Sequence, residues 1–481
     1  MRFLVLIHRW MGIILCLFFS IWFLSGAVLI YHPFPSLSQD ERLARSANVD
    51  YSKILISPRE AISAANISEP DRLRLIDLEG RPIFVIHSFD NTIITIGGDN
   101  GKKLSSFTNE AAGRIAERFS NKPISHVDGP IEYDQWIVHQ RLDAYRPFFR
   151  VHFKDVDSTV LYVSVRTGEV LQKTLGAERT WSYFGAVVHW LYPTVLRKDW
   201  ALWDQTVWWI SLLGVITTIA GLWLGAYRLR ILKQAKQYFI SSPFNGWLWG
   251  HHILGIFIGL FVLTWMLSGW LSMDHGRIFS QPHPHQEQVS NYRGISITEA
   301  SESVSTDALK TIKSFREAEI IAVGGKAFVL NKIKNGLQLY EPRNNQSLSS
   351  TELTQTQVIE AVGHAWPGLN VISAERLKNN DFYGKLRSGS LPDSTLRIFM
   401  NDHAQTWVHV NMESGEILST MDRSRRLYRW LFNGLHSLDF PGLTNHRPLW
   451  DILILTLLTL GFIFSITGVI IGWKRIFYLK N

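Results

Sequence analysis

The chain is poor in cysteine and in charged residues. Cys16 is the single cysteine among 481 residues, and no C-x-x-C-H sequence occurs. One thiol excludes a disulfide scaffold, a thiolate-bound iron–sulfur cluster and a cysteine-rich zinc site, and the missing motif excludes covalent c-type haem attachment. Charged residues make up 19% of the chain, against about 25% in soluble domains, while 46% are hydrophobic. This composition excludes a disordered or fibrous protein.

Four stretches carry no Asp, Glu, Lys or Arg and are mostly apolar: 10–31, 205–227, 253–273 and 452–473. A bilayer core of about 30 Å needs about 20 helical residues, so each stretch is long enough to cross it. The first stretch is too long for a signal peptide, and no clear small-x-small cleavage site follows it. The sequence therefore predicts a membrane protein whose four transmembrane helices lie in a lipid bilayer.

The positive charge lies beside these helices. The formal net charge is +8. Basic but no acidic residues occupy the N-terminal piece, the loop after the second helix and the tail: Arg2, Arg9, Arg228, Arg230, Lys233, Lys236, Lys474, Arg475 and Lys480. Because basic residues mark cytoplasmic segments, we expect both termini inside and two long loops, 32–200 and 274–450, outside. The rest of the chain is nearly neutral, so a nucleic-acid partner loses its support.

The two halves of the chain resemble each other. A shift of 243 residues places 8–26 on 251–269, and a shift of 247 places TGEV at 167–170 on SGEI at 414–417 and His189 on His436. Both halves have the same orientation, and parallel repeats are related by an axis along the membrane normal. The predicted fold is therefore a four-helix transmembrane bundle built from a parallel internal duplication, with matching residues facing each other across the axis.

Each half also contains an α+β domain outside the membrane. We expect helices at 57–65 and 354–365, a hairpin from 80–87 and 92–96, and strands at 159–165 and 406–412 that end in glycine turns. The expected segments are helix one (1–32), outer domain one (33–178), a histidine-bearing segment with helix two (179–228), a cytoplasmic loop (229–246), helix three (247–274), outer domain two (275–425), and a histidine-bearing segment with helix four and the tail (426–481).

Pairs of histidines lie at two membrane depths. His8 and His251 begin the first and third helices on the inner side, and His189 and His436 precede the second and fourth helices on the outer side. Ionisable residues at membrane depth are costly and mark functional sites, and imidazole is a common axial ligand of haem iron. The pattern predicts two b-type haems. Zinc or copper transport also uses histidine, but no intramembrane carboxylate path joins the two depths.

Several neighbouring residues leave alternatives open. His32 and His275 follow the outer ends of helices one and three and are alternative or additional outer ligands, while His252 competes with His251. Arg9 is a candidate partner of haem propionates.

Glycines near the histidines have two interpretations. Gly12, Gly255 and Gly259 lie near the inner histidines, where glycine permits close approach of a flat macrocycle. The G-x-x-x-G pairs at 221/225 and 468/472 predict close helix packing.

The motifs resemble those of the PepSY-associated transmembrane family over nearly the whole chain. HRWMG at 8–12 followed by LSG at 24–26 is similar to the family's start, VRTGEV at 165–170 to a PepSY strand end, and VHWL at 188–191 and LHSL at 435–438 to its L-H-x-x-L. HHILG at 251–255 departs from the His-Arg-Trp pattern. Members include iron-regulated inner-membrane proteins and di-haem ferric-siderophore reductases. The resemblance implies that His8, His251, His189 and His436 are haem ligands and that the outer domains are PepSY-like.

The leading hypothesis is a bacterial inner-membrane di-haem b reductase that passes electrons to a periplasmic ferric siderophore or other ferric chelate. No G-x-G-x-x-G follows a strand and the cytoplasmic segments are short, so we expect membrane quinol or a separate reductase as electron donor. Two alternatives stay open. One is a cofactor-free PepSY binding or regulatory protein, and the other is a permease for iron or another metal.

Overall fold

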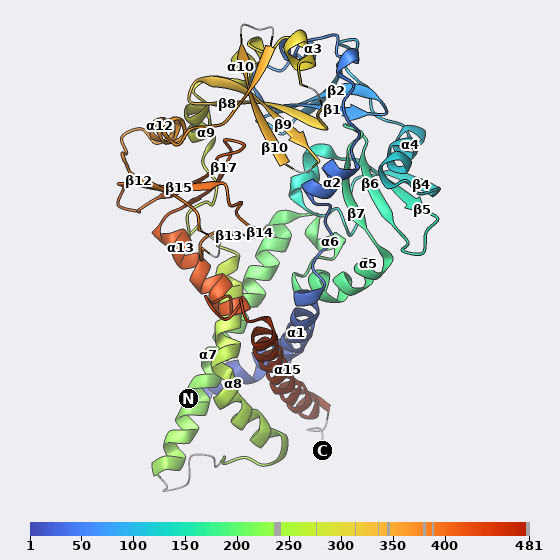
Figure 1. The fold of residues 1–481 in the computed structure, drawn as a ribbon. Coiled ribbons are helices and arrows are strands. Elements are labelled where there is room, and N and C mark those ends of the chain that lie inside the picture. Colours follow the sequence, from blue (N-terminus) through green and yellow to red (C-terminus); the bar gives the residue numbers. More distant parts are fainter. Residues whose placement is uncertain are drawn as a thin grey trace. The chain divides into compact units, whose positions relative to one another are not determined.

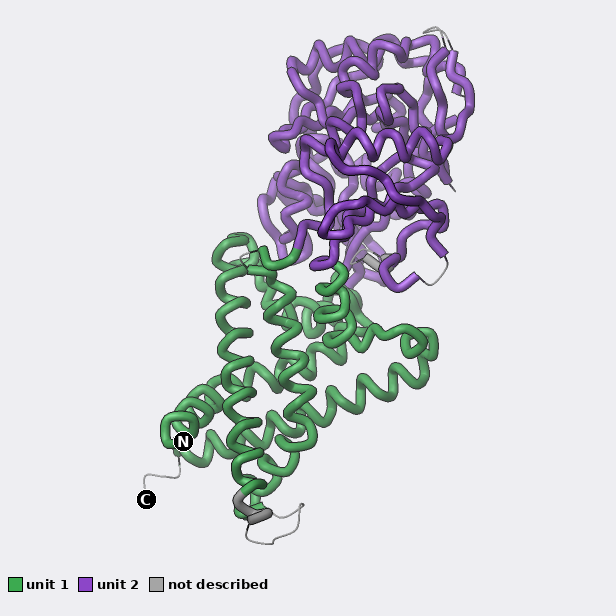
Figure 2. The backbone as a smooth tube through the Cα atoms, turned by 90° about the vertical axis from the view of Figure 1, so that its left-hand side faces the viewer, with its two compact units in different colours: residues 1–34, 177–279, 426–481 green, residues 35–176, 280–425 purple. Residues whose placement is uncertain are grey.

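The structure is a computed structural model that describes residues 1–234, 242–275, 277–312, 314–334, 336–343, 347–378, 381–386 and 389–477. Lys236 and Lys480, which contributed to the predicted orientation, lie outside the described residues. The chain forms two compact units (Figure 2). The helical unit comprises Met1–Phe34, Ala177–Phe279 and Arg426–Asn481, and the sheet unit comprises Pro35–Gly176 and Ser280–Arg425.

Four long helices make up most of the helical unit (Figure 1): α1 (Arg2–Tyr31), α7 (Trp200–Gln234), α8 (Gly246–Ser272) and α15 (Arg447–Phe477). Each is long and apolar enough to cross a membrane. Helix α1 packs against α7 and α15, and α8 packs against the same two helices. The four predicted spans are therefore confirmed as long apolar helices, and they form a closed ring.

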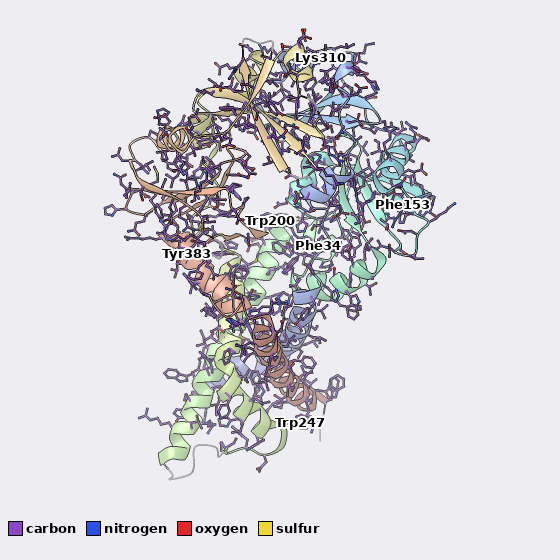
Figure 3. All side chains as sticks on the ribbon, viewed as in Figure 1. Phe34, Phe153, Trp200, Trp247, Lys310 and Tyr383 are labelled. Carbon is purple, nitrogen blue, oxygen red and sulfur yellow. The ribbon has the colours of Figure 1, made fainter. Side chains whose placement is uncertain are left out.

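Neighbouring helices in the ring run antiparallel. The Tyr31 hydroxyl at the end of α1 donates a hydrogen bond of 2.9 Å to the Asp451 carboxylate near the start of α15. Beyond the end of α8, His275 Nδ1 lies 3.4 Å from the Asp204 carboxylate near the start of α7. Trp200 and Trp247 lie at opposite ends of the bundle (Figure 3). Exposed tryptophans at both ends are typical of the two membrane–water interfaces.

Short irregular helices lead into α7 and α15: α5 (Gly176–Ser182), η3 (Tyr183–Val187), α6 (Thr194–Arg197), α13 (Arg423–Arg429), η4 (Trp430–Gly434) and α14 (Leu435–Ser437). Both η3 and η4 are single π-helical turns, and they begin 247 residues apart. Leu191 and Leu438, also 247 apart, both adopt a left-handed backbone conformation, with φ of 52° and 51°. Such π turns are frequent at functional sites, and these two lead directly into His189 and His436.

The sheet unit contains a seven-stranded sheet with the order β11-β10-β9-β8-β1-β2-β3. Its strands are β1 (Pro70–Leu78), β2 (Arg81–Ser88), β3 (Ile93–Gly97), β8 (Glu317–Val323), β9 (Lys326–Ile333), β10 (Gly336–Arg343) and β11 (Ser347–Thr351). Strand β1 of the first outer segment pairs antiparallel with β8 of the second, with Leu73 opposite Ile320. The two segments therefore share a sheet and a core instead of folding as two independent domains. The pairing of β1 with β8 gives hydrogen-bond partners to the backbone groups along two strand edges. Separate domains would leave these edges unpaired.

Each segment also has a four-stranded sheet of its own. The first contains β4 (Ile124–Ile131), β5 (Phe148–Phe153), β6 (Val160–Ser164) and β7 (Val170–Thr174), with α4 (Asn109–Ser120) packed on it. The second contains β12 (Val371–Arg376), β15 (Thr395–Met400), β16 (Trp407–Asn411) and β17 (Ile417–Met421), with α12 (Gln355–Ala365) nearby. The remaining elements are α2 (Gln39–Arg45), η1 (Tyr51–Lys53), α3 (Pro58–Ala65), η2 (Gln140–Tyr145), α9 (Gln286–Arg293), α10 (Ile297–Glu302), α11 (Thr306–Lys310), β13 (Lys385–Leu386) and β14 (Gly389–Ser390).

The predicted local elements of the outer segments are confirmed. Ser57 caps α3 and Thr354 caps α12, and both helices begin with a capping box. The predicted hairpin is β2–β3. Gly168 and Gly415 follow the strands that carry the repeated turn, and both have φ of 71°, a conformation in which glycine is favoured.

Candidate functional site

The inner histidines come together in the helical bundle. His8 on α1 and His251 on α8 have ring centroids 6.2 Å apart. His8 Nδ1 donates to the backbone carbonyl of Thr217 on α7 at 3.0 Å. His251 Nδ1 lies 2.8 Å from the Thr467 hydroxyl on α15, and that hydroxyl itself donates to a backbone carbonyl. All four long helices thus position this pair.

The outer histidines form a second pair of the same kind. His189 and His436 have ring centroids 6.1 Å apart. His189 Nδ1 donates to the Trp22 carbonyl at 3.1 Å. His436 Nδ1 lies 3.0 Å from the Ser268 hydroxyl, which donates to the Trp265 carbonyl. The segments that directly follow the two π-helical turns supply the histidines, while α1 and α8 supply the groups that contact Nδ1.

The hydrogen bonds fix which ring nitrogen can bind a metal. At His8 and His189 the partner is a carbonyl, and at His251 and His436 it is a hydroxyl whose proton is already donated elsewhere. The carbonyls require a proton on Nδ1 of His8 and His189, so Nε2 keeps its lone pair there, and the hydroxyl contacts are compatible with the same tautomer at His251 and His436. Histidines that ligate metals characteristically donate their other ring N–H in this way.

Glycines make room for the imidazoles. A Cβ on Gly221 of α7 would lie 2.5 Å from His8 Cε1, and one on Gly26 of α1 would lie 3.2 Å from His189 Cε1. On α15, a Cβ on Gly468 would collide with Cys16 Sγ and lie 3.5 Å from His251. The predicted close packing at the G-x-x-x-G pairs is thus confirmed at Gly221 and Gly468. The side chains packed against these two glycines include those of His8 and His251.

The glycines expected beside a macrocycle lie in different surroundings. A Cβ on Gly12 would meet nothing within 4 Å, whereas one on Gly255 would lie 3.2 Å from Phe464 and one on Gly259 would lie 2.8 Å from Leu222. Side chains from α7 and α15 therefore already pack against Gly255 and Gly259. Open space remains next to Gly12, one helical turn beyond His8.

The two pairs are separated along the bundle. His8 and Ser25, a neighbour of His189, both lie on α1, and 17 residues at about 1.5 Å each place them about 25 Å apart. Between them lies an apolar core that includes Leu15, Phe19 and Val262. The predicted arrangement at two depths is therefore present, with a hydrophobic layer between the pairs.

The separation within each pair fits one bound metal ion. Two imidazoles held through Nε2 on opposite sides of an ion, at metal–nitrogen bonds of about 2.0–2.1 Å, have ring centres about 6.2–6.4 Å apart. The observed 6.2 and 6.1 Å agree with this value. Among the described residues, neither pair has a third histidine, cysteine or carboxylate close enough to share an ion. Zinc needs such ligands, whereas haem supplies four of its own and needs only two axial groups, so the pairs fit haem.

An orphaned cation lies near the outer pair. Arg197 is buried, and within the described chain its Nε and Nη1 have no hydrogen-bond partner. Its guanidinium lies over the ring of Trp203, 4.7 Å from the centroid, and that indole donates to the carbonyl of Trp190, which follows His189. An unpaired buried guanidinium suits a carboxylate such as a haem propionate. No sequence pattern marks this residue, because a lone arginine beside aromatic residues forms no recognisable motif.

The other candidate residues lie apart from these pairs. His251 pairs with His8, whereas His252 contacts the Ser242 hydroxyl at 3.0 Å. The exposed His32 stacks on Trp181 with ring centroids 5.2 Å apart, and His275 contacts Asp204. Arg9 is half-buried on α1. No contact among the described residues joins His32 to His275, so the structure forms two histidine pairs and leaves the third apart.

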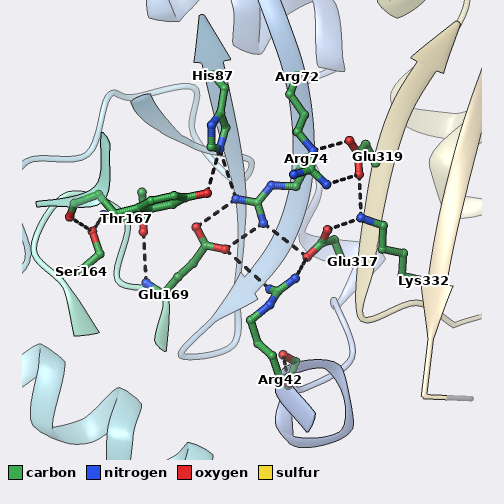
Figure 4. A network of polar contacts seen from close by, with 12 residues as sticks. Arg42, Arg72, Arg74, His87, Ser164, Thr167, Glu169, Glu317, Glu319 and Lys332 are labelled. Carbon is green, nitrogen blue, oxygen red and sulfur yellow. Dashed lines mark hydrogen bonds and ion pairs between the residues drawn. The ribbon is translucent and has the colours of Figure 1, made fainter. Parts of the chain in front are cut away.

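A buried network of ion pairs joins the two outer segments (Figure 4). Arg74 of β1 binds Glu169 at 2.8 Å and reaches Glu317 of β8 at 3.4 Å. Lys332 of β9 binds Glu317 at 2.8 Å and Glu319 at 2.6 Å. The network also contains Arg42, Arg72 and His87.

Opposite charges decide the protonation states in this network. Burial by itself raises the pKa of Glu319, but the charges of Arg72 and Lys332 outweigh it and hold the pKa at about 2. Burial, reinforced by the charge of Arg74, lowers the pKa of His87 to about 4. The glutamates are therefore ionised and His87 is neutral near pH 7. Every carboxylate in the network is paired with a cation, and the pairs link β1, β8 and β9. The network therefore has a structural role, which is to hold these strands together.

A family model described as the PepSY-associated TM region matches residues 5–475. The protein therefore belongs to the family of membrane proteins with PepSY-associated transmembrane regions. No curated protein matches the chain in sequence.

Proposed function

We propose that this protein is an inner-membrane di-haem b oxidoreductase that passes electrons outward to reduce a periplasmic ferric chelate, such as a siderophore. The observation that carries the proposal is that four histidines form two imidazole pairs, with ring centroids 6.2 and 6.1 Å apart, and that each Nδ1 lies within hydrogen-bond distance of a neighbouring helix. Haem supplies one-electron chemistry when it is bound. The two halves, with their matching histidines and π turns, support an origin by parallel duplication.

The residues of the bundle would hold the two groups at fixed depths. His8 and His251 would ligate the inner iron, and His189 and His436 the outer iron, through Nε2. The carbonyls and hydroxyls on Nδ1 orient the rings and increase their basicity as ligands. The apolar layer between the pairs excludes water, and Arg197 would neutralise a propionate near the outer pair.

The orientation and the substrate follow from charge and coordination chemistry. The basic residues at the N-terminus, at the end of α7 and at the end of α15 favour a cytoplasmic position for these ends. The sheet unit would then lie in the periplasm, where an Fe(III) chelate arrives. Reduction to Fe(II) weakens binding by hard oxygen ligands and releases iron. Membrane quinol or a separate reductase would supply the electrons on the inner side.

The activity is tested by mixing anaerobically reduced protein with a ferric siderophore and measuring reoxidation of the protein and appearance of Fe(II) in a ferrous-specific chelator assay. We expect both signals in the native protein and neither in the His189→Ala/His436→Ala variant. The His32→Ala/His275→Ala variant is the matched control, and it should behave as the native protein does. Reduced protein that does not react with any ferric chelate would refute the reductase activity while leaving the haem sites intact.

A further inference from the structure

Two histidines and an aspartate come together on the surface of the sheet unit. They belong to the neighbouring strands β4 and β5, which Figure 1 labels. His126 of β4 lies directly opposite His152 of β5, and their rings stack with centroids 4.2 Å apart and an interplanar angle of 8°. Asp128 lies two residues after His126 and therefore on the same face of the strand. Its Oδ2 lies 3.2 Å from Nε2 of His152 and 3.8 Å from Nε2 of His126.

The three side chains have the composition and spacing of a metal site. One ligand atom from each lies within 4.8 Å of the others, and no other such group of three is found among the described residues. Two imidazoles and one carboxylate are a ligand set used for zinc and for non-haem iron, with coordination positions left open. All three side chains reach solvent, with exposed fractions of 55%, 37% and 26% for His126, Asp128 and His152. An ion can therefore enter without opening the fold.

The second outer segment shows what this region looks like without the histidines. In the first segment Arg150 binds Asp134 at 2.8 Å and Asp128 at 2.9 Å. At positions 247 residues later, Arg397 binds Asp381 at 2.6 Å and lies 3.7 Å from Glu375.

At the positions that match the two histidines, the second segment has Ser373 opposite Phe399. The arginine–carboxylate arrangement thus forms without imidazoles at these two positions, although Arg397 Nε also donates to Nε2 of His409 on β16 at 2.8 Å. The stacked histidines are therefore an addition specific to the first segment, not a requirement of the sheet.

The surrounding charges favour a cation. Asp128 and Asp134 carry two negative charges against the single positive charge of Arg150, so the group is net negative when the imidazoles are neutral. Arg150 also holds the Asp128 carboxylate in place through two nitrogen contacts. Carboxylates that ligate metals are commonly fixed by such outer hydrogen bonds.

We propose that His126, Asp128 and His152 bind a divalent first-row transition-metal ion, of the kind that prefers imidazole ligands. The site lies wholly in the sheet unit, and none of its ligands belongs to the helical unit, so it is independent of the proposed haem sites. Imidazole ligands favour zinc, copper, iron and nickel over magnesium and calcium.

The test uses the full-length protein with its cofactors, purified in detergent and treated with a chelator to remove loosely held metal. Calorimetric titration with Zn²⁺ should show one tight site per chain, and titration with Mg²⁺ should show none. The His126→Ala/His152→Ala variant should lose the site. Removing a residue that only hydrogen-bonds to a metal ligand already lowers metal affinity about 10–100-fold, and removing two ligands lowers it further.

Two further variants make the result decisive. His283→Ala/His285→Ala removes two exposed histidines from the same unit and should leave zinc binding unchanged. His126→Ser/His152→Phe installs the pair that the second segment uses at the matching positions, so it should fold normally and fail to bind zinc. A native protein without a zinc site, or zinc binding that survives in both His126/His152 variants or disappears in the His283/His285 variant, would overturn the proposal.

Discussion

At the scale of single residues, the central feature is the use of Nδ1 of four histidines as hydrogen-bond donors to the helices around them. His8 and His189 donate to backbone carbonyls, and His251 and His436 lie against hydroxyls that are themselves donors. These contacts occupy Nδ1, so Nε2 is the nitrogen available to a ligand. The hydroxyls of Thr467 and Ser268, at 2.8 and 3.0 Å from Nδ1, orient the imidazoles of His251 and His436.

Removing one outer ligand tests this assignment. His436→Ala should lose one of the two haems, so that the haem content per chain falls by about half, because the outer pair would keep a single axial group. The measurement is the haem-to-protein ratio together with the low-spin absorption bands. His403→Ala, which changes a histidine of the sheet unit, is the control. Full haem content in His436→Ala would contradict the assignment.

The glycines beside the inner pair allow a finer test. Gly221→Ala places a Cβ 2.5 Å from His8 Cε1, whereas Gly225→Ala on the same helix meets only Ile256 at 3.8 Å. The first change should displace the His8 ring and reduce or perturb the inner haem, and the second should be tolerated. The absorption spectra of the two variants, recorded side by side, distinguish this steric effect from a general loss of helix packing, which would affect both.

The sequence was sufficient to find the histidines but not their surroundings. His8, His251, His189 and His436 were visible because two shifts superpose them, and the structure brings them together in the expected pairs. The choice of His251 over His252 could not be made from sequence, because it depends on which side of α8 faces the bundle. Arg197 and Gly221 were missed as site residues, since their roles arise from contacts between distant parts of the chain.

At the scale of elements, β1 and β8 decide how the outer segments are built. Each segment alone would leave one of these strands at the edge of a sheet, and the two edges pair with Leu73 opposite Ile320. Alternation in the sequence predicted the strands at 80–87, 92–96, 159–165 and 406–412, which are β2, β3, β6 and β16. It predicted neither β1 nor β8, and it did not indicate that strands from different halves pair. The residues that join the two strands are buried charges, Arg74 in the first half and Glu317 in the second. A sequence pattern of alternating polar and apolar residues would place both charges in solvent.

Breaking the buried network should destabilise the sheet unit. Arg74→Met removes the buried cation that binds Glu169 at 2.8 Å and leaves Arg42, at 3.6 Å, as the remaining cation beside that carboxylate, a change that costs up to about 3–5 kcal/mol. Arg81→Met removes an exposed ion pair with Asp99 and should cost about 0–1 kcal/mol. Thermal unfolding of the full-length variants checks this difference. Equal melting temperatures would show that the network does not hold β1 to β8.

The same network predicts acid sensitivity. Opposing charges keep the pKa of Glu319 at about 2, below its ordinary value of 4.5, so the stability that it contributes is present above pH 4.5 and is lost as the pH falls towards 2. His87, whose pKa is lowered to about 4 from 6.5, adds a loss in the same direction between pH 6.5 and 4. Unfolding measured across this range should show stability falling steadily with acidification. A flat profile down to pH 3 would contradict the assigned protonation states.

At the scale of the whole molecule, one ring of four helices carries two histidine pairs at two depths, and the family match covers 5–475. Each half of the chain supplies one histidine to each pair, so neither half can complete a site alone. In the proposed function, these two sites join the donor side of the membrane to the chelate side.

The central claim is that the bundle binds two haems, and the most direct test is the absorption spectrum of the purified protein, oxidised and reduced with dithionite, together with pyridine haemochrome quantitation. The expected result is low-spin b-type bands and two haems per chain, produced by expression with ample haem supply. A colourless protein under the same conditions would show that the paired imidazoles do not hold haem. That result would contradict the proposed oxidoreductase function.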